Sequence, residues 1–344
     1  MDRHVSPRIA YWTGAFEPGM EAVASEIAVL RRRFPASVAW GLSRRHRVLL
    51  SWRRGFCLDP RLHLAFRAAT RLLEPAFQIN HVFGSLGDWF YLQGAKRRPT
   101  VLTVATQAPP VDAALLARVD RFVVEYPAAM DLLRDMGIDG GRIRMVLPPV
   151  DLARFTPSAA PRSPFTVLFA SSPDDASWLE ARGLPGLLDA AALRPEMAFR
   201  LLWRPWGDSL PRLRGWIAER GLANVEVVVG RFADMGAQYR AAHATVAPFA
   251  LMGACKPSPN SLVESLACGR PVVTTPGVGL AGLIRESGAG VVCPGDGASL
   301  ADALDRLQTG WVDYSVRARR LAERRFSEED FVARYREVYA ELIG

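Results

Sequence analysis

The sequence is poor in the residue types that build disulfide frameworks and metal sites. It contains only four cysteines and five histidines among 344 residues, and both types are scattered along the chain. No Cys-x-x-Cys pair or histidine cluster provides the spacing that a zinc site requires. We therefore expect neither a structural metal nor a disulfide framework, and we interpret the cysteines as buried thiols in a reducing compartment.

Long apolar runs are also missing. No stretch approaches the roughly 18 consecutive apolar residues that a membrane-spanning helix needs. The first four residues, Met-Asp-Arg-His, lead directly into a predicted strand at 8–13, without an apolar signal segment. We expect a cytoplasmic protein, whose contact with a membrane would be peripheral and at its inner face.

Lysine is nearly absent, and the positive charge is unevenly distributed. Two of the 43 basic residues are lysines. Residues 1–157 hold 22 basic and 14 acidic residues, whereas the remainder holds 21 of each. The excess is concentrated in four short clusters: Arg31–Arg33, Arg44–Arg47, Arg53–Arg54 and Lys96–Arg98. Such clusters attract anions, for example a phospholipid surface or an anionic, lipid-linked acceptor; a solvated basic face is the alternative. No nucleic-acid-binding motif accompanies them, so no nucleic-acid partner is expected.

Short β-branched runs alternate with amphipathic helical stretches along the whole chain. In the first part, strands are predicted at 8–13, 37–40, 48–51, 78–82, 100–106, 121–125 and 144–147. In the second part, they are predicted at 165–170, 198–203, 225–229, 244–247, 271–275 and 290–293. This alternation is typical of doubly wound α/β folds. The length suits two such lobes.

A proline-rich stretch interrupts both periodicities. Residues 156–164 contain three prolines and several small residues, as an interdomain linker would. We therefore predict a first Rossmann-like domain at 1–157, a second at 158–325 and a C-terminal helix at 326–344 that packs back toward the first domain. Ligands of open α/β sheets bind beyond the carboxyl ends of the strands, so two facing lobes would form a cleft with a site on each wall.

The densest motif follows the strand predicted at 244–247. It runs from Lys256 to Pro271 and predicts a helix from about Ser261 to Gly269. The first-turn amides of Asn260, Ser261 and Leu262, together with the helix dipole, would suit a diphosphate. Glu264, one turn later, could accept hydrogen bonds from sugar hydroxyls. The spacing of Ser261 and Glu264 also fits a capping box, which is the structural alternative.

This motif resembles the donor-binding signature of the retaining glycosyltransferases of family 4, in group 1. In that family a Glu, seven residues and a second Glu precede a Leu-Ala-Cys-Gly-x-Pro-Val-Val run, and the second Glu, which matches Glu264, holds the ribose hydroxyls of the nucleotide. Segments 121–155 and 326–343 are similar to the end of the first lobe and to the terminal helix of the family. The resemblance implies a GT-B fold, a nucleoside-diphosphate sugar as donor, a hydroxyl acceptor and no cofactor or metal.

Several positions depart from the family pattern. The first Glu is replaced by Lys256, and the phosphate-binding Arg of the family falls near Ser171 and Ser172, with Ser172 taken as its position. The family's Lys-Gly pair resembles Arg182-Gly183, and Arg204 could restore the lost charge. We therefore predict that Arg182, Lys256 and Arg204 bind the diphosphate, and we assign Lys256 and Glu264 to the catalytic centre. Base recognition is expected at Gly230 and Arg231.

In the first lobe, the resemblance points to loops that approach the donor and the acceptor. Gly14 and Gly19 belong to a loop similar to the family's glycine-bearing loop, with a surface turn as the alternative. The family's His-x-His pair is matched only at its first position, His81, followed by Gly84 and Ser85. No catalytic histidine is therefore carried over.

The function predicted from these features is retaining, metal-independent glycosyl transfer in bacterial glycan or glycoconjugate biosynthesis. Two alternatives stay open, because Lys256, Ser172 and Phe83 replace family residues. One is a non-catalytic nucleotide-sugar-binding protein, or partner subunit, with the same fold. The other is a sugar-nucleotide epimerase, which would need acidic and histidine groups that the sequence does not provide.

Overall fold

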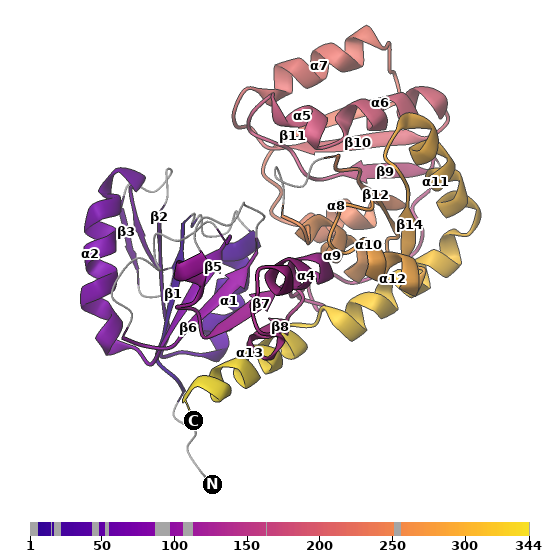
Figure 1. Cartoon of the computed structure of the whole chain (residues 1–344). Coiled ribbons are helices and arrows are strands. Elements are labelled where there is room, and N and C mark those ends of the chain that lie inside the picture. The colour runs from indigo at the N-terminus through magenta and orange to yellow at the C-terminus, as the bar shows by residue number, and fades with distance from the viewer. Residues whose placement is uncertain are drawn as a thin grey trace. The chain divides into compact units, whose positions relative to one another are not determined.

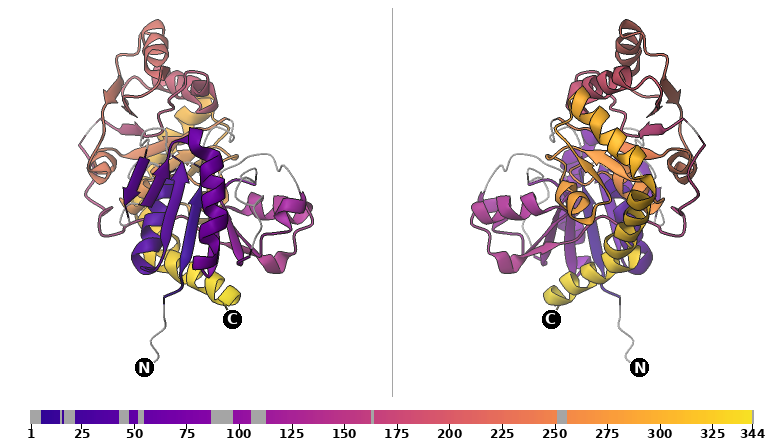
Figure 2. Two further views of the ribbon diagram at one scale, coloured as in Figure 1. Left: turned by 90° about the vertical axis from the view of Figure 1, so that its left-hand side faces the viewer. Right: turned by 90° about the vertical axis from the view of Figure 1, so that its right-hand side faces the viewer.

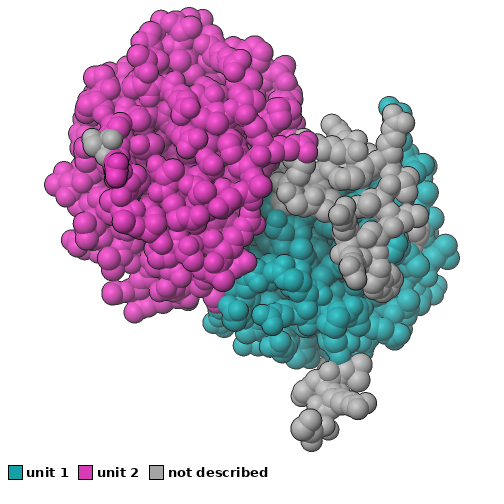
Figure 3. Space-filling model, turned by 180° about the vertical axis from the view of Figure 1, so that it is seen from behind, with its two compact units in different colours: residues 1–149, 328–344 teal, residues 150–327 magenta. Residues whose placement is uncertain are grey.

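The computed structural model of the chain describes residues 6–14, 16, 22–42, 48–51, 55–86, 97–105, 113–162, 164–250 and 256–343. The chain divides into two compact units (Figures 1 and 3). Unit 1 comprises residues 1–149 and 328–344, and unit 2 comprises residues 150–327. The C-terminal helix is therefore part of unit 1, although it follows unit 2 in sequence.

Unit 1 is built on an eight-stranded sheet of order β3-β4-β2-β1-β5-β6-β7-β8. Its strands are β1 (Ile9–Thr13), β2 (Val38–Leu42), β3 (Val48–Ser51), β4 (Gly55–Leu58), β5 (Ile79–Gly84), β6 (Thr100–Val104), β7 (Arg121–Val124) and β8 (Ile143–Met145). Its helices are α1 (Ala22–Arg33), α2 (His63–Leu73), α3 (Ala113–Leu116), α4 (Pro127–Asp135) and α13 (Glu328–Ile343), with short 3-10 turns η1 (Pro60–Leu62), η2 (Glu74–Ala76) and η3 (Gly140–Arg142). All pairs are parallel except β3 with β4, an edge hairpin.

The two faces of this sheet bury alternate residues of each strand, as the two-residue period of a strand requires. In β1, Ile9 and Tyr11 join one hydrophobic cluster, whereas Ala10 and Trp12 join the other. The first cluster also contains residues of α1 and α13, and the second contains residues of α4. Helices thus cover both faces, which explains why the strands read as nearly continuous apolar runs.

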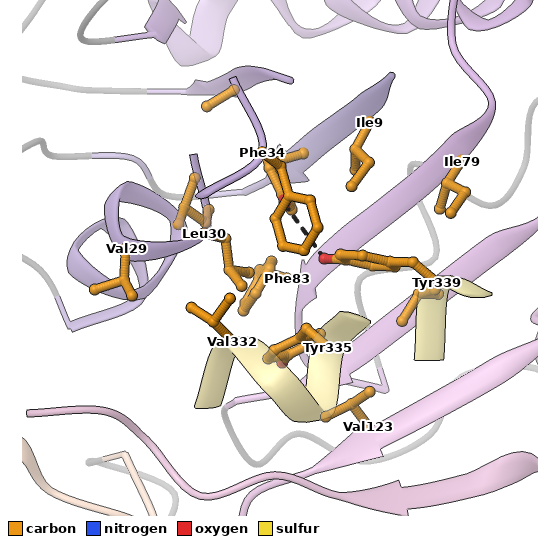
Figure 4. Close-up of a cluster of buried hydrophobic side chains, with 14 of the residues drawn as sticks. Ile9, Val29, Leu30, Phe34, Ile79, Phe83, Val123, Val332, Tyr335 and Tyr339 are labelled. Atoms are coloured by element: carbon orange, nitrogen blue, oxygen red, sulfur yellow. Dashed lines mark hydrogen bonds between the residues drawn. The ribbon is translucent and has the colours of Figure 1, made fainter. Parts of the chain in front are cut away.

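Helix α13 packs against a hydrophobic cluster of unit 1 (Figure 4), and a buried polar network lies within this contact. The two nitrogens of His81 lie 2.6 Å from the Tyr339 hydroxyl and 2.7 Å from the Thr103 hydroxyl. The Thr103 hydroxyl also lies 2.8 Å from that of Tyr335. Both tyrosine rings point from α13 into the cluster formed with α1 and the sheet. At the end of the helix, Glu341 binds two arginines of β7 and β8.

Unit 2 has a six-stranded, fully parallel sheet of order β11-β10-β9-β12-β13-β14. Its strands are β9 (Thr166–Phe169), β10 (Ala198–Trp203), β11 (Val225–Val229), β12 (Ala244–Ala247), β13 (Val272–Thr274) and β14 (Gly290–Val292). Its helices are α5 (Trp178–Ala181), α6 (Leu184–Leu193), α7 (Ser209–Glu219), α8 (Met235–Arg240), α9 (Asn260–Ala267), α10 (Ala281–Ser287), α11 (Gly297–Thr309) and α12 (Trp311–Arg325).

The segment 156–164, which the sequence predicted to be an interdomain linker, belongs instead to unit 2. Its anchor is Arg270, a fully buried residue after α9. The Arg270 guanidinium donates to the carbonyls of Ser158 and Ala159 and to the Ser158 hydroxyl, at 2.8–3.1 Å. Such charge-assisted bonds hold an extended, proline-rich chain without regular structure. The prolines therefore belong to a segment that is bound to the rest of unit 2. The division between the units falls between residues 149 and 150.

The predicted strands agree with the structure apart from a few terminal residues and one omission. Strand β4 was missed because its four residues, Gly55–Leu58, contain a glycine and show no clear alternation. The two doubly wound α/β units that the sequence predicted are confirmed. None of the described helices combines the length and apolar character needed to cross a membrane.

Candidate functional site

The residues that the sequence predicted to bind a donor follow the carboxyl ends of neighbouring strands in unit 2. Ser172 follows β9, Arg204 follows β10, Gly230 follows β11, and Lys256 and α9 follow β12. These four strands are adjacent and parallel. Their carboxyl ends therefore meet at one edge of the sheet, the position where open α/β sheets bind ligands.

Glu264 projects from α9, and its contacts exclude the capping box with Ser261. The helix begins at Asn260, with Pro259 at the N-cap and no side-chain cap. Ser261 is therefore already inside the helix, and the capping box with Glu264 does not form. Instead, the Tyr239 hydroxyl donates to a carboxylate oxygen of Glu264 at 2.9 Å. The buried Tyr239 orients the carboxylate and leaves its remaining lone pairs for another partner.

Opposing effects set the pKa of Glu264. Burial raises the pKa of Glu264 to about 7, while the Tyr239 hydroxyl and the positive charges of Arg154 and Arg204 act to lower it. The side chain is only partly shielded from solvent, so an incoming ligand can reach it. A carboxylate that titrates near neutral pH and faces two arginines is typical of a functional site.

Arg182 is held in a defined position at the same edge. Its guanidinium donates to the Ser171 hydroxyl and lies 5.3 Å from the centre of the Phe249 ring. The next residue, Gly183, has a φ of 71°, and a Cβ there would lie 1.8 Å from the Pro248 carbonyl oxygen. Only glycine allows this close approach, which joins the start of α6 to the segment after β12.

The loop after β9 is tied to the loop after β10. The Arg204 amide donates to the Ser172 hydroxyl at 3.1 Å, and the Asp208 amide donates to the Asp174 carbonyl at 2.9 Å. The Arg204 guanidinium is exposed and lies 4.8 Å from the centre of the Trp206 ring. Ser172 therefore positions the backbone of Arg204, whose positive charge acts to lower the pKa of Glu264.

The first turn of α9 only partly agrees with the prediction. Leu262 is fully buried and its amide donates to the Pro259 carbonyl at 3.1 Å. Its amide is thus engaged, and the prediction that it binds a ligand is corrected. The amides of Asn260 and Ser261 precede the first helical hydrogen bond and remain the candidate donors. Lys256 lies four residues before the helix and is partly exposed.

Gly230 and Arg231 lie at the end of β11. The Gly230 amide donates to the Trp203 carbonyl at 2.9 Å, which fixes this turn beside Arg204. Arg231 is exposed. The prediction that these residues recognise a base stays a prediction.

In unit 1, the structure separates the residues that were grouped as a loop. Gly14 follows β1, and Gly84 and Ser85 end or follow the adjacent strand β5, so these three share one sheet edge. Gly19 lies outside the described residues. His81 is instead fully buried in the middle of β5, with both ring nitrogens engaged in the α13 network. Its assignment to a ligand loop is therefore corrected: burial lowers the pKa of His81 well below its usual value and keeps it neutral.

The basic clusters of the first part of the chain differ in their contacts. Arg32 donates two hydrogen bonds to Glu328, and Arg33 lies 3.9 Å from Glu329. These two arginines therefore pair with the start of α13. Arg97 and Arg98 are exposed. The clusters at 44–47 and 53–54, and Lys96, lie outside the described residues.

Two contributors were missed by the sequence reasoning: Tyr239, which binds Glu264, and Arg154, whose charge acts on Glu264. Ser171 was named as part of the serine pair, but not as the acceptor of the Arg182 guanidinium. Arg154 belongs to the segment at 121–155 that carried the family resemblance, so a signal existed. No local pattern marks Tyr239, because it acts on a residue 25 positions away in sequence.

The chemistry of this edge combines cations with a hydroxyl-binding carboxylate. Arg182 and Arg204 provide positive charge for an anion, and Glu264 can accept hydrogen bonds from a diol. Among the described residues, no three histidine, cysteine, aspartate or glutamate side chains lie together as metal ligands would. A ligand with both phosphate and sugar groups fits these partners.

Comparison with known proteins agrees with this arrangement. Residues 175–309, which include Arg182, Arg204 and Glu264, match the family model described as glycosyl transferases group 1. The chain is 34% identical over 202 residues to a probable transglycosylase of Burkholderia thailandensis, covering 54% of this chain and 49% of that protein. It is 30% identical over 263 residues to a D-inositol 3-phosphate glycosyltransferase of Salinispora arenicola, covering 67% of this chain and 56% of that protein. The chain thus spans about half the length of these relatives.

The fold is matched by solved structures over almost the whole chain. HepE from Anabaena, solved in complexes with UDP and with UDP-glucose, superposes with a TM-score of 0.77 in its UDP complex, at 17% identity. The superposition covers 97% of this chain and all of HepE. The chain therefore has the GT-B fold, and its second unit carries the sequence features of group 1 glycosyltransferases.

Proposed function

We propose that the protein is a glycosyltransferase that moves a sugar from a nucleoside-diphosphate sugar to a hydroxyl acceptor with retention of configuration. The observation that carries the proposal is the arrangement of Glu264, Arg204 and Arg182 at one sheet edge, within the residues that match the group 1 family. The complexes of HepE with UDP and UDP-glucose support a nucleotide sugar as the donor. The bacterial relatives support a role in glycan or glycoconjugate biosynthesis.

In the proposed reaction, unit 2 binds the donor and stabilises its departure. Glu264 accepts hydrogen bonds from the ribose hydroxyls, while Arg182, Arg204 and Lys256 neutralise the diphosphate. The bond between the anomeric carbon and the phosphate oxygen breaks, and a bond to the acceptor oxygen forms on the same face. The acceptor proton passes to a phosphate oxygen of the leaving group. The protein thus acts by positioning and by electrostatic stabilisation.

The proposed reaction needs no metal, because arginine and lysine side chains carry the neutralising charge. Unit 1 is proposed to bind the acceptor, whose anionic or lipid-linked character is suggested by the basic clusters.

A thermal-shift screen of nucleotide sugars, beginning with UDP-glucose, identifies the donor, since a ligand bound by the native state raises the unfolding temperature. Release of nucleoside diphosphate from that donor, unchanged by EDTA, is the expected result. Loss of release with EDTA and its recovery with manganese would refute the metal-independent mechanism.

The role of Arg182 is tested by comparison with another arginine of unit 2. Arg182→Ala removes a cation from the site and is expected to weaken donor binding about 10- to 100-fold, the range for one charge-assisted contact. Arg214, which is exposed on α7, provides the matched control as Arg214→Ala. Calorimetric titration with the donor measures both. Equal affinities of the two variants would contradict the assignment.

Lys256 is the position where this chain departs from the family pattern, and its variants separate two functions. Lys256→Ala is expected to weaken binding of the nucleoside diphosphate about tenfold or more, because a point charge beside the phosphates is lost. If Lys256→Ala binds the nucleoside diphosphate as tightly as the wild type does, Lys256 does not belong to the donor site. Tight donor binding by the wild-type protein without any release of nucleoside diphosphate, alone or with acceptors, would instead favour the non-catalytic binding protein.

A further inference from the structure

Helix α2 of unit 1 carries an exposed apolar stripe. Leu64 and Leu72 expose 68% and 80% of their surface, and Leu62, in the preceding turn, exposes 43%. Ala65 and Ala68 are also exposed. Positions 64, 65, 68 and 72 follow the three- and four-residue spacing of one helical face. Single exposed leucines are common, but a row of apolar side chains along one face indicates a contact surface.

The opposite side of the same helix is fixed to unit 1. Leu73 packs against the hydrophobic cluster that contains Trp12, Val38 and Phe77. Figures 1 and 2 show α2 lying along one face of the unit 1 sheet. The stripe therefore belongs to a helix whose last residue, Leu73, packs against the unit 1 core, whereas Leu64 and Leu72 stay exposed.

Positive charge surrounds the stripe. Arg61 and Arg71 are exposed at its two ends, and the Arg98 guanidinium donates to the Pro75 carbonyl at 3.2 Å, just beyond the helix. Between residues 60 and 76 the only acidic residue is Glu74. Its carboxylate is 5% exposed and accepts from the Asn80 amide and from the backbone amides of Arg97 and Arg98. The outward face of α2 is thus apolar and cationic.

We infer that α2 docks unit 1 onto an anionic lipid surface, lying in the plane of the interface with Leu64 and Leu72 inserted. An apolar face flanked by arginines is the pattern of an interfacial helix, in which arginines contact headgroups while leucines enter the acyl boundary. A second copy of the chain fits less well, because a twofold contact through this stripe would bring like-charged arginines together. The inference does not depend on the proposed transfer reaction.

Vesicle co-sedimentation of the full chain, without nucleotide, tests the inference. The probes are vesicles of equal parts phosphatidylglycerol and phosphatidylcholine, and vesicles of phosphatidylcholine alone. We expect binding to the anionic vesicles that weakens with added salt, and much weaker binding to the neutral ones. Leu64→Ser with Leu72→Ser is expected to lower the partition coefficient about tenfold or more, because both inserted side chains become polar.

The chain offers a matched control for this double variant. Val312 and Val316 expose 68% and 54% of their surface on α12 of unit 2. Val312→Ser with Val316→Ser makes the same kind of change on another helix and is expected to leave vesicle binding unchanged. Arg61→Ala with Arg71→Ala is expected to weaken only the binding to anionic vesicles. Thermal unfolding confirms that the variants remain folded, as exposed positions should.

Several results would overturn the inference. The first is that the wild-type protein does not sediment with anionic vesicles at low ionic strength. The second is that the leucine variant binds these vesicles as strongly as the wild type does. The third is that the valine control loses as much vesicle binding as the leucine variant. A concentration-dependent dimer that disappears in the leucine variant, without vesicle binding, would identify a second copy as the partner instead. Donor binding, measured separately by thermal shift, would be unaffected by any of these results.

Discussion

At the scale of single residues, Glu264 determines how the site responds to pH. Its pKa of about 7 results chiefly from burial, which favours the neutral acid. The ordinary value is 4.5, so folding raises the pKa. The group therefore stabilises the folded state relative to the unfolded one at acidic pH, and this contribution is lost as pH rises from about 4.5 to about 7. The proposed binding of ribose hydroxyls by Glu264 would have the opposite pH dependence, because only the carboxylate accepts two hydroxyl bonds.

We therefore expect the affinity for the nucleotide sugar to increase as pH rises through 7. One pH unit below the pKa only about a tenth of the protein carries the carboxylate, so binding should be about tenfold weaker than at alkaline pH. Titration calorimetry with the nucleotide sugar, repeated at several acidic and alkaline pH values, measures this change in affinity. Glu264→Gln cannot ionise, and its weaker binding should show no such step. A pH-independent affinity in the wild type would exclude Glu264 as the hydroxyl acceptor.

At the scale of elements, the loops at the sheet edge are shaped by close backbone contacts. Gly183 at the start of α6 approaches the Pro248 carbonyl, and the same type of contact places Gly207 against the Asp174 carbonyl. Both glycines have a positive φ. These contacts hold Arg182 and Arg204 near their positions, so the geometry of the site depends on residues that carry no functional group.

Gly183→Ala is expected to destabilise unit 2 by more than about 2 kcal/mol, because left-handed strain of roughly 1–2 kcal/mol adds to a backbone clash. Gly221 is the control, since its φ of 62° is similar but a Cβ there would meet nothing within 4 Å. Gly221→Ala should therefore cost only about 1 kcal/mol, the strain alone. Urea unfolding compares the two variants. Equal losses would show that contact with Pro248 does not restrict the position.

At the scale of the whole molecule, the end of the chain completes the first unit. Helix α13 inserts Tyr335 and Tyr339 into the unit 1 core, where they bind Thr103 and His81. The second unit is therefore inserted between two parts of the first. Loss of the C-terminal helix would expose a core face of unit 1 without removing any residue of unit 2.

Tyr339→Phe is expected to lower the stability of unit 1 by about 1–3 kcal/mol, because a buried His81 nitrogen loses its partner. Unit 2 should be unaffected, so donor affinity should stay at the wild-type level. Tyr314, partly exposed on α12, provides a control as Tyr314→Phe, with little expected effect. Calorimetric unfolding and donor titration together test this. A loss of donor affinity without a loss of stability would contradict the structural role.

The sequence by itself determined the positions of all strands except β4, the two doubly wound units and the positions at the sheet edge. These follow from local periodicity and from the rule that ligands bind beyond the carboxyl ends of parallel strands. Arg204 and Glu264 could be placed at one edge for this reason, although they are 60 residues apart in sequence. Only the tertiary structure decided which groups are buried and what they bind.

Spacing allowed Ser261 and Glu264 to form a cap, but packing against α8 brought Tyr239 to the carboxylate instead. The family resemblance grouped His81 with the ligand loops, but both of its ring nitrogens bind buried groups of β6 and α13. Residues 156–164 resembled a free linker, but the buried Arg270 binds the carbonyls of Ser158 and Ala159 in this segment. In each case the partner is distant in sequence, and a local pattern cannot specify a contact whose energy depends on another part of the chain.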